Sequence, residues 1–410
     1  MKITLIRQDN GSGKETLSVC EAGTLFDKMK TETKAGHITA LRGIIPLLEG
    51  TYARYEHIDK LPYIYSAVEY TRTKEGERKM KQYQLAMPQQ VFSGETAMQA
   101  LEALASGHEK AVVFTDAGIR ASGILERPLA ELDKAAVPYI INDTLPAEPT
   151  CDQAQQVIDT FRESNADLIV AVGGGSVMDI AKLASITADG SCTVRDQLKN
   201  PRIGKKTVTT VMIPTTAGTG SEATPNSIVA VPEEQLKVGI VNPEMIADAV
   251  ILDGNMIRRL PRKIAASTGI DALCHAIECY TSAKANPFSD LFAMQALRLI
   301  FRNLEKACDD PDALDAKEKM MQAAFYAGVA ITCSGTTAVH ALSYPLGGRY
   351  HIPHGVANAI MLMPVMQFIG NLGYVAISIL GGYFAISGRI TVGNIQSFIT
   401  YTRNFTQPIS

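Results

Sequence analysis

The chain has 410 residues, of which 46% are hydrophobic and 20% charged, a balance typical of a globular protein of two or three domains with a sizeable core. Its formal net charge of −3 argues against a global nucleic-acid-binding role. The seven cysteines include no Cys-x-x-Cys pair and the N-terminus has no apolar signal-peptide core, so we expect free thiols in a reducing cytoplasm.

The first segment, residues 1–83, is rich in charged residues and tyrosine. Its apolar pattern predicts a strand at Met1–Arg7 and one or two helices within 23–48. The stretches Cys20–Lys30 and Glu69–Arg78 resemble the N-terminal part of mobile-element proteins of the virulence-associated protein E type. The resemblance implies an α+β extension that is a fragment of such a domain, and it assigns no chemistry to this segment.

The next segment, residues 84–257, alternates short apolar strands with helices. Strands are predicted at 111–115, 167–172, 208–213 and 250–252, and a helix at 152–163. Such alternation is typical of a parallel sheet covered by helices on both faces. We therefore expect an α/β dinucleotide-binding domain of the Rossmann-like class.

Two of these predicted strands end in glycine-rich turns, Gly173–Ser176 and Pro214–Glu222. Glycines let backbone N–H groups approach a pyrophosphate, and a helix that begins at such a turn points its positive end at the phosphates. Either turn alone could be only a tight connection or a helix cap, but the two together favour a dinucleotide. Asp116, after the first predicted strand, either binds ribose hydroxyls and favours NAD over NADP, or caps the next helix.

From about residue 258 the pattern becomes helical. Helices are predicted at 263–281, 287–306 and 316–332. Asp271 and His275 are four residues apart and so share one helix face, although such a pair could also be a surface pair or a helix-end charge. His340 and His354 follow in a stretch rich in glycine and proline. One aspartate and three histidines would form a four-ligand site for a divalent metal.

Four motifs occur in order along this part of the chain. They are Gly-Gly-Gly-Ser-x-x-Asp-x-x-Lys from position 173, Pro-Thr-Thr-Ala-Gly-Thr-Gly-Ser-Glu from 214, Gly-Ile-Asp-Ala-Leu-x-His-Ala-Ile-Glu from 269 and His-x(13)-His-Gly from 340. Together they resemble the iron-containing (group III) alcohol dehydrogenase family over about residues 84–366. The resemblance implies an α/β domain at 84–257 followed by an all-α metal-binding domain at 258–366.

The resemblance also implies the site residues and the chemistry. The implied metal ligands are Asp271, His275, His340 and His354. The implied cofactor contacts are Asp116, Gly173, Gly174, Gly175, Ser176, Asp179, Thr215, Thr216, Thr219 and Lys237. With NAD and Fe2+ (or Zn2+), such an enzyme transfers hydride between the nicotinamide and a primary alcohol or aldehyde bound to the metal.

Alternatives on the same fold are glycerol-type dehydrogenases and maleylacetate-type reductases. Some family members carry another histidine four residues after the first late ligand, where this chain has Tyr344, so the sequence leaves the substrate preference open. Family members commonly form dimers or larger assemblies, and we therefore expect a cytoplasmic homo-oligomer.

The final segment, residues 367–410, contains an uncharged run at 368–387 that is long enough to span a bilayer. Residues 370–409 resemble a fragment of an ABC exporter membrane domain, which implies a membrane helix and membrane contact through 368–387; the alternative is a buried helix of the soluble domain. Because family members continue well beyond the last ligand, we expect a truncated helical domain. The three-part pattern also admits a fusion or assembly artefact, a chimeric chain with little or no activity.

Overall fold

The computed structural model describes residues 5–7, 16–19, 83–146, 148–234, 236–350 and 352–406. The chain forms two compact units, Met1–Lys81 and Gln82–Ser410. In the first unit, β1 (Leu5–Arg7) pairs antiparallel with β2 (Thr16–Val19). The strand predicted at the N-terminus is present as β1, and the helices predicted after it lie outside the described residues.

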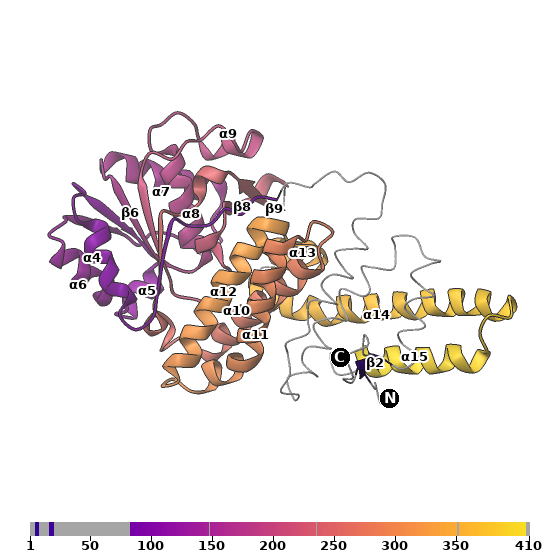
Figure 1. Cartoon of the computed structure of the whole chain (residues 1–410). Helices are drawn as coiled ribbons and strands as arrows, with labels where there is room; N and C mark the ends of the chain where they lie inside the picture. The colour runs from indigo at the N-terminus through magenta and orange to yellow at the C-terminus, as the bar shows by residue number, and fades with distance from the viewer. Residues whose placement is uncertain are drawn as a thin grey trace. The chain divides into compact units, whose positions relative to one another are not determined.

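A six-stranded parallel sheet forms one half of the second unit (Figure 1). Its strand order is β3 (Gln90–Ser93), β10 (Ala249–Leu252), β7 (Thr209–Pro214), β6 (Leu168–Gly173), β4 (Ala111–Phe114) and β5 (Tyr139–Asn142). The four predicted strands are confirmed. Sequence analysis missed the edge strands β3, which is mostly exposed, and β5, which is only partly buried.

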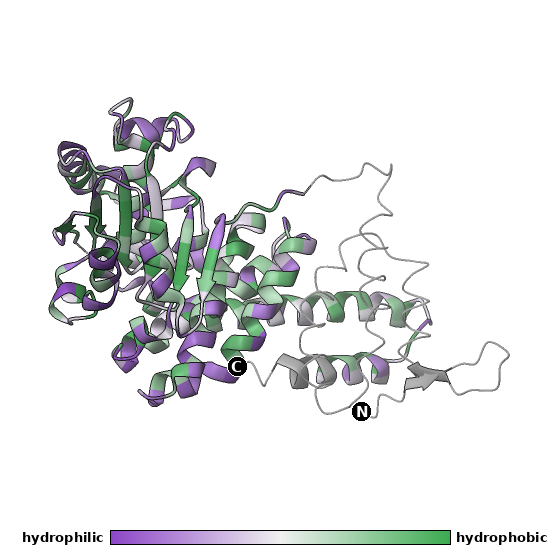
Figure 2. Ribbon diagram, turned by 60° about the vertical axis from the view of Figure 1, so that its left-hand side comes forward, coloured by the Kyte–Doolittle hydropathy of each residue, from purple (hydrophilic) through white to green (hydrophobic). Residues whose placement is uncertain are grey.

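Both faces of the sheet are buried, which explains why its central strands read as uninterrupted apolar runs. Alternate residues of each strand enter different hydrophobic clusters: Ile169 and Ala171 of β6 pack on one face, whereas Leu168, Val170 and Val172 pack on the other. Figure 2 shows these strands as strongly hydrophobic. The sheet therefore provides a rigid support for the turns at its carboxyl edge.

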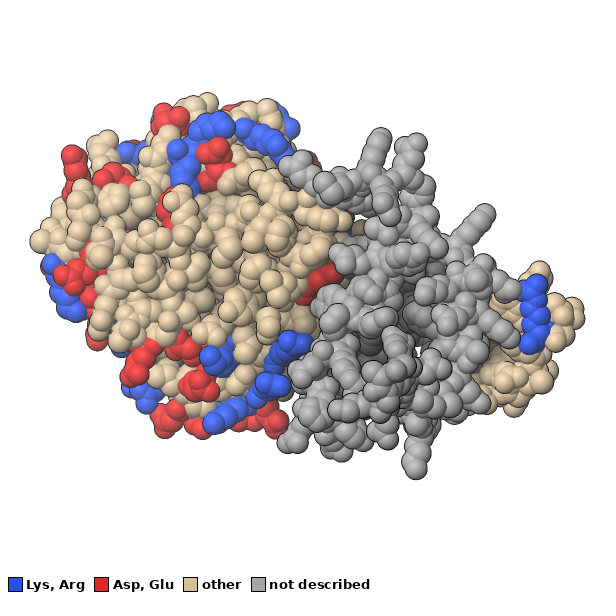
Figure 3. Space-filling view, in the orientation of Figure 1, with Lys and Arg blue, Asp and Glu red and all other residues tan. Residues whose placement is uncertain are grey.

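Helices cover the two faces of the sheet. α7 (Cys151–Glu163) and α8 (Gly175–Thr187) contribute to one cluster, and α4 (Ala100–Ala105) and α6 (Glu126–Lys134) to the other. Two shorter helices complete this part, α5 (Ala117–Ala121) and α9 (Val194–Lys199). On the face shown in Figure 3, acidic and basic side chains are interspersed, so this face presents no continuous basic surface.

A helical bundle follows the sheet, as the sequence predicts. The three predicted helices are α10 (Arg262–Thr281), α11 (Pro287–Asp309) and α12 (Leu314–Ser334). They pack on one another and share the larger hydrophobic cluster with α7 and α8. A Rossmann-like parallel sheet followed by an all-helical part is therefore confirmed.

Two further features of the second unit were not predicted. The antiparallel hairpin of β8 (Asn226–Val231) and β9 (Leu236–Val241) follows the second glycine turn. The stretch from His340 was expected only to be rich in glycine and proline, but most of it is α13 (Ala338–Tyr350), a helix that contains Pro345. Burial of α13 against its neighbours outweighs the unfavourable helix propensity of these residues.

One continuous helix, α14 (His354–Ile386), crosses the expected segment boundary between residues 366 and 367. Its first turns are part of the core, with Ala357, Leu362 and Val365 buried. Beyond them α14 is largely exposed, and α15 (Val392–Thr406) folds back beside it (Figure 1). Among the described residues α14 is long and apolar enough to cross a membrane, a test that a core helix also passes.

The bundle and the second glycine turn meet at a close backbone contact between Gly220 and Gly328. Gly220 has a φ of +60°, and a Cβ there would lie 2.6 Å from the Cα of Gly328 on α12. A Cβ at Gly328 would overlap the carbonyl oxygen of Gly220. Only glycine fits at both positions without displacing the turn.

We expect Gly328→Ala to lower the free energy of unfolding by about 1–3 kcal/mol, the usual cost of overpacking. The control is Gly373→Ala on α14, where a Cβ would meet nothing within 4 Å; there, better helix propensity should raise stability by up to about 1 kcal/mol. Urea denaturation of both variants measures the difference. Equal stability of the two variants would contradict the close contact.

Candidate active site

A cavity of about 220 Å³ lies between the glycine turns, the β8–β9 hairpin and the helices that carry the predicted metal ligands. All four predicted metal ligands line it. The predicted cofactor residues that line it are Gly175, Ser176, Asp179, Thr219 and Lys237. The other five lie outside its lining: Asp116, Gly173, Gly174, Thr215 and Thr216. The cavity thus joins the two sites that the sequence predicted separately.

The two glycine turns lie side by side because β6 and β7 are neighbours in the sheet. Gly173 pairs with Pro214, and the backbone N–H of Thr215 donates to the carbonyl of Gly173 at 2.9 Å. A Cβ at Gly175 would lie 3.0 Å from the Thr219 side chain, so the turns are in close contact. α8 begins at Gly175, so the free N–H groups and the positive end of this helix lie at the contact between the two turns.

Two hydroxyl groups at the second turn are buried without a partner among the described residues. They are the Oγ1 atoms of Thr215 and Thr216. Buried polar groups are normally hydrogen-bonded, so these hydroxyls are available to a bound ligand. Together with the free helix end, they fit a phosphate-bearing cofactor.

Lys182 is a buried cation that ties the two turns and the hairpin together. Its Nζ lies 3.0 Å from Asp179 Oδ1 and donates to Ser221 Oγ at 2.7 Å and to the Ser221 carbonyl at 2.9 Å. It also donates to the Asn226 carbonyl. Burial lowers the pKa of Lys182, and the carboxylate of Asp179 opposes that shift. Sequence analysis quoted this lysine within a motif but gave it no role.

Asp179, predicted to contact the cofactor, is already committed to protein contacts. It accepts from Ser221 Oγ and from the backbone N–H of Ile228 at 2.9 Å. Asp116 has a similar local role, since its Oδ1 accepts from the N–H of Ile119 at 2.9 Å and so caps α5. The capping alternative is therefore observed for Asp116, and cofactor contact by either aspartate stays a prediction.

The four predicted metal ligands converge although they come from three helices. Asp271 and His275 lie on α10, His340 on α13 and His354 at the start of α14. The ligand atoms all lie within 4.8 Å of one another. The three Nε2 atoms surround Asp271 Oδ1 at 4.0 Å (His275), 3.5 Å (His340) and 3.6 Å (His354). The rings of His275 and His340 are stacked, with centroids 4.3 Å apart.

The charges of this cluster are strongly coupled. Burial opposes ionisation of Asp271, but the neighbouring histidines outweigh it and lower the pKa of its carboxyl below the usual range. Burial lowers the pKa of His275 to about 4, so its imidazole is neutral near pH 7. Burial also opposes the charged form of His340, yet Asp271 and Glu278 raise its pKa to about 9. The two carboxylates therefore favour a positive charge at the centre of the cluster.

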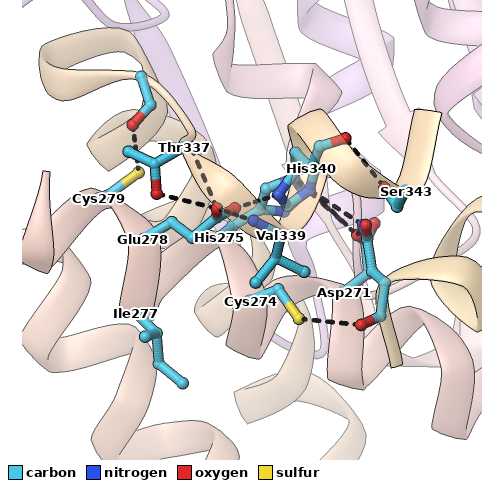
Figure 4. A network of polar contacts seen from close by, with 12 residues as sticks. Asp271, Cys274, His275, Ile277, Glu278, Cys279, Thr337, Val339, His340 and Ser343 are labelled. Carbon is cyan, nitrogen blue, oxygen red and sulfur yellow. Dashed lines mark hydrogen bonds and ion pairs between the residues drawn. The ribbon is translucent and has the colours of Figure 1, made fainter. Parts of the chain in front are cut away.

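Glu278 holds His340 from the side opposite the cluster (Figure 4). Its Oε2 accepts from Nδ1 of His340. Its Oε1 accepts from the hydroxyl of Thr337 at 2.9 Å and from the backbone N–H of Val339 at 2.6 Å. With a proton held on Nδ1 by Glu278, Nε2 of His340 is the nitrogen that would give up its proton and bind a metal. Glu278 thus sets both the orientation and the tautomer of this ligand.

Asn358 and Tyr344 complete the surroundings of the cluster. The amide nitrogen of Asn358 lies 2.5 Å from Asp271 Oδ1 and 3.0 Å and 3.2 Å from the Nε2 atoms of His340 and His354. An amide has two N–H bonds and cannot donate to three acceptors at once. The ring of Tyr344 stacks on that of His354, with the ring centroids 5.8 Å apart. Burial raises the pKa of Tyr344 to about 12, so the tyrosine hydroxyl stays protonated.

Sequence analysis missed the roles of Glu278 and Asn358. Glu278 lies seven residues after Asp271 and three after His275, so helical periodicity puts all three on one face of α10, and that signal was available. Asn358 lies one turn after His354 on α14, but this is visible only once the helix is known to start at His354.

Comparison with known proteins places the chain among dehydrogenases. The family model described as "Iron-containing alcohol dehydrogenase" matches residues 88–254, and the model described as "Fe-containing alcohol dehydrogenase family, C-terminal" matches 265–387. The second match includes the run 368–387, which sequence analysis assigned to a transporter-like segment.

Individual relatives agree with the family models. Long-chain-alcohol dehydrogenase 1 of Geobacillus thermodenitrificans is 37% identical over 64% of this chain and 67% of its own length. NAD-dependent methanol dehydrogenase of Bacillus methanolicus is 32% identical over 64% of this chain and 69% of its own length. A crystal structure of a 1,3-propanediol oxidoreductase superposes with a TM-score of 0.66 at 31% identity, covering 80% of this chain and 87% of that one.

Proposed function

Because this chain belongs to the iron-containing alcohol dehydrogenase family, we propose that it transfers hydride between NAD and a primary alcohol or aldehyde held at a divalent metal. We assign the metal to Asp271, His275, His340 and His354. The observation that carries the proposal is the convergence of three Nε2 atoms on Asp271 Oδ1 beside the glycine turns, within one cavity.

The donor set fits a divalent metal. A tetrahedral ion with bonds of about 2.0–2.2 Å keeps its ligand atoms roughly 3.4 Å apart. Asp271 Oδ1 lies 3.5–4.0 Å from the histidine nitrogens, and all four ligand atoms lie within 4.8 Å of one another, slightly wider than a bound ion requires. Three imidazoles and one carboxylate suit Fe2+ and Zn2+ alike, and the family is described as iron-containing. Glu278 supplies the carboxylate that a metal-bound histidine commonly requires.

The second half of the cavity fits NAD. Gly175, Ser176 and Thr219 line it at the N-terminus of α8. The partnerless hydroxyls of Thr215 and Thr216 lie outside its lining, at the carboxyl end of β7, where nucleotides bind in open parallel sheets. Lys182 contacts both Asp179, on the helix after the first turn, and Ser221 of the second turn, so the two turns are fixed relative to each other before a cofactor binds.

The chemistry follows from the placement of these groups. When bound, the metal lowers the pKa of an alcohol or polarises an aldehyde carbonyl, and the nicotinamide carries the hydride. The protein contributes orientation: Glu278 would hold His340 toward a bound ion, and Asn358 donates to Oδ1 of Asp271. The buried bundle limits water around the ligands. No nucleophile is required of any cysteine.

The decisive experiment combines metal analysis with turnover. We expect the purified chain to hold one divalent metal and to form NADH from short primary alcohols. Removal of the metal by a chelator should abolish turnover, and Fe2+ or Zn2+ should restore it. Metal without turnover on any alcohol, glycerol included, would support the alternative of an inactive chimeric chain. Full activity in the metal-free protein would refute the proposal.

The ends of the chain add no further function to the proposal. The mobile-element resemblance of 1–83, the transporter resemblance of 367–410, membrane contact through 368–387, cytoplasmic location and homo-oligomer formation all stay predictions. The first turns of α14 carry His354 and Asn358, so that helix serves the proposed active site whatever its distal part contacts.

A further inference from the structure

The distal part of α14, residues 368–386, lies outside the hydrophobic core that the first turns of this helix share. Its large apolar side chains are exposed: Ile379 is 67% exposed and Ile386 92%, and the others are Phe368, Leu372, Val375, Leu380 and Tyr383. α15 folds back beside this part of α14, and together they form the distal hairpin, residues 368–406 (Figure 1). A contiguous exposed apolar surface marks contact with another protein or with a membrane.

The charge pattern distinguishes between these two partners. No Asp, Glu, Lys or Arg occurs between Arg349 and Arg389, and no Asp or Glu occurs after Glu318. A soluble helix that docks on another protein through one apolar stripe keeps charged residues on its other faces, whereas a helix without charges on any face is typical of a protein core or a membrane span. The distal part of α14 is outside the core, and basic residues without acidic neighbours complement anionic lipid headgroups.

The length and the tip of the distal hairpin fit a bilayer. At 1.5 Å per residue, residues 368–386 form roughly 28 Å of helix, close to a hydrocarbon layer of about 30 Å. At the tip, the guanidinium of Arg389 lies over the ring of Phe384, 5.7 Å from its centroid, and the ring of Tyr383 lies beside that of Phe384. Aromatic and basic side chains gather at membrane–water interfaces.

Hydroxyl groups of the distal hairpin are satisfied within their own helices. Oγ of Ser378 donates to the carbonyl of Tyr374 at 2.9 Å, and Oγ1 of Thr400 donates to that of Gln396 at 2.9 Å. Hydrogen bonds of this kind meet the requirement that polar groups within lipid find partners inside the protein. These hydroxyls therefore need no water.

The two helices of the distal hairpin also approach each other closely. A Cβ at Gly381 of α14 would lie 2.9 Å from Cγ1 of Ile395 on α15. Small residues at such contacts allow helices to pack in membranes, where van der Waals contact replaces the hydrophobic effect between helices. The distal hairpin is therefore held together by its own packing.

We propose that the distal hairpin inserts into a lipid bilayer and anchors the protein to a membrane, with Arg389 among the headgroups of the far side. α14 is continuous from His354 to Ile386, so the anchor and the proposed active site share one helix. Residue 368 lies about 21 Å along the helix from His354, which leaves the proposed active site in water near the membrane surface. The inference is independent of the proposed dehydrogenase activity, because its tests measure lipid contact and no turnover.

Flotation of the full chain with vesicles of phosphatidylcholine and phosphatidylglycerol is the first test. We expect the wild type to float and to stay bound in high salt and in alkaline carbonate, since salt releases proteins that are held only by charge. Val375→Lys combined with Ile379→Lys puts two cations in the middle of the apolar segment and should reduce the bound fraction about tenfold or more. Both side chains are exposed, so the core of the protein is unchanged.

The matched control adds the same two charges elsewhere. Leu291→Lys combined with Phe301→Lys changes two exposed apolar side chains of α11 and should leave flotation at the wild-type level. Equal flotation of the two double variants overturns the inference, as does wild-type binding that high salt removes.

A single tryptophan reports directly on insertion, because the chain contains none. The emission of Ile379→Trp should shift to shorter wavelength when vesicles are added, and lipids brominated near the middle of the bilayer should quench it. Phe301→Trp on α11 should show neither change. A protein that floats without quenching of Ile379→Trp binds lipid through another surface and overturns the inference.

Light scattering in detergent-free buffer tests a second copy of the chain as the occupant. A wild-type dimer that does not float, and that becomes a monomer when Val375→Lys is combined with Ile379→Lys, would assign the distal hairpin to a protein interface and overturn the inference. A wild-type chain that stays monomeric in solution and binds no vesicles overturns it as well.

Discussion

Asp271→Asn is expected to remove the metal and to reduce kcat/KM for alcohol oxidation roughly a thousandfold or more, because a bound metal contributes several kcal/mol of transition-state stabilisation. Asp271 is the one anionic member of the four-ligand cluster, and the Nε2 atoms of the three histidines all face its Oδ1. An amide of the same shape keeps the packing of α10 and loses the negative charge that balances the ion.

Metal content by elemental analysis and NADH formation by absorbance measure the two effects together. The control is Cys274→Ser on the same helix, a buried side chain whose Sγ contacts the backbone carbonyl of Asn358 and which is not one of the four proposed ligands. We expect that variant to retain its metal. Wild-type metal content in Asp271→Asn would refute the assignment of this residue, and equal loss in both variants would point to a general disturbance of α10.

Glu278→Gln is expected to weaken metal affinity by about 10–100-fold, the usual effect of removing a carboxylate that supports a metal-bound histidine. The glutamine amide cannot accept from His340 Nδ1, Thr337 and Val339 at once, because one end of it is a donor. His340 then loses both its fixed orientation and the tautomer that directs Nε2 at the cluster.

Competition of the metal-free protein with a coloured chelator measures this affinity. Thr337→Val is the control, since it removes only the 2.9 Å hydrogen bond to Oε1 and leaves Oε2 on His340; its affinity should stay within about threefold of the wild type. Wild-type affinity in Glu278→Gln would show that the packing of α13 alone orients His340. A loss in Thr337→Val as large as in Glu278→Gln would contradict the particular importance of Oε2.

Much of the fold could be predicted because its signals are local. The central strands β4, β6, β7 and β10 are buried on both faces and read as apolar runs, and α10, α11 and α12 have clear helical patterns. β3 and β9 were missed because polar residues or glycine interrupt their apolar residues. β5 and β8 contain the apolar runs Tyr-Ile-Ile and Ile-Val-Ala-Val, but these are only partly buried and sequence analysis assigned no strand to them. α13 was missed because tertiary packing overrides the helix-breaking character of Pro345 and its neighbouring glycines.

By itself, the sequence determined the chemistry of the candidate site. An aspartate and a histidine one helical turn apart, and glycine turns directly after buried strands, are local patterns, but each of them alone left a structural alternative open. The order of the four motifs along the chain, and the family resemblance that they carry, gave these patterns their meaning. Only the tertiary structure decided which side chains meet. The packing of α10, α13 and α14 brings His340, His354 and Asn358 to Asp271. No periodicity encodes such long-range contacts, because they depend on how whole elements pack against one another.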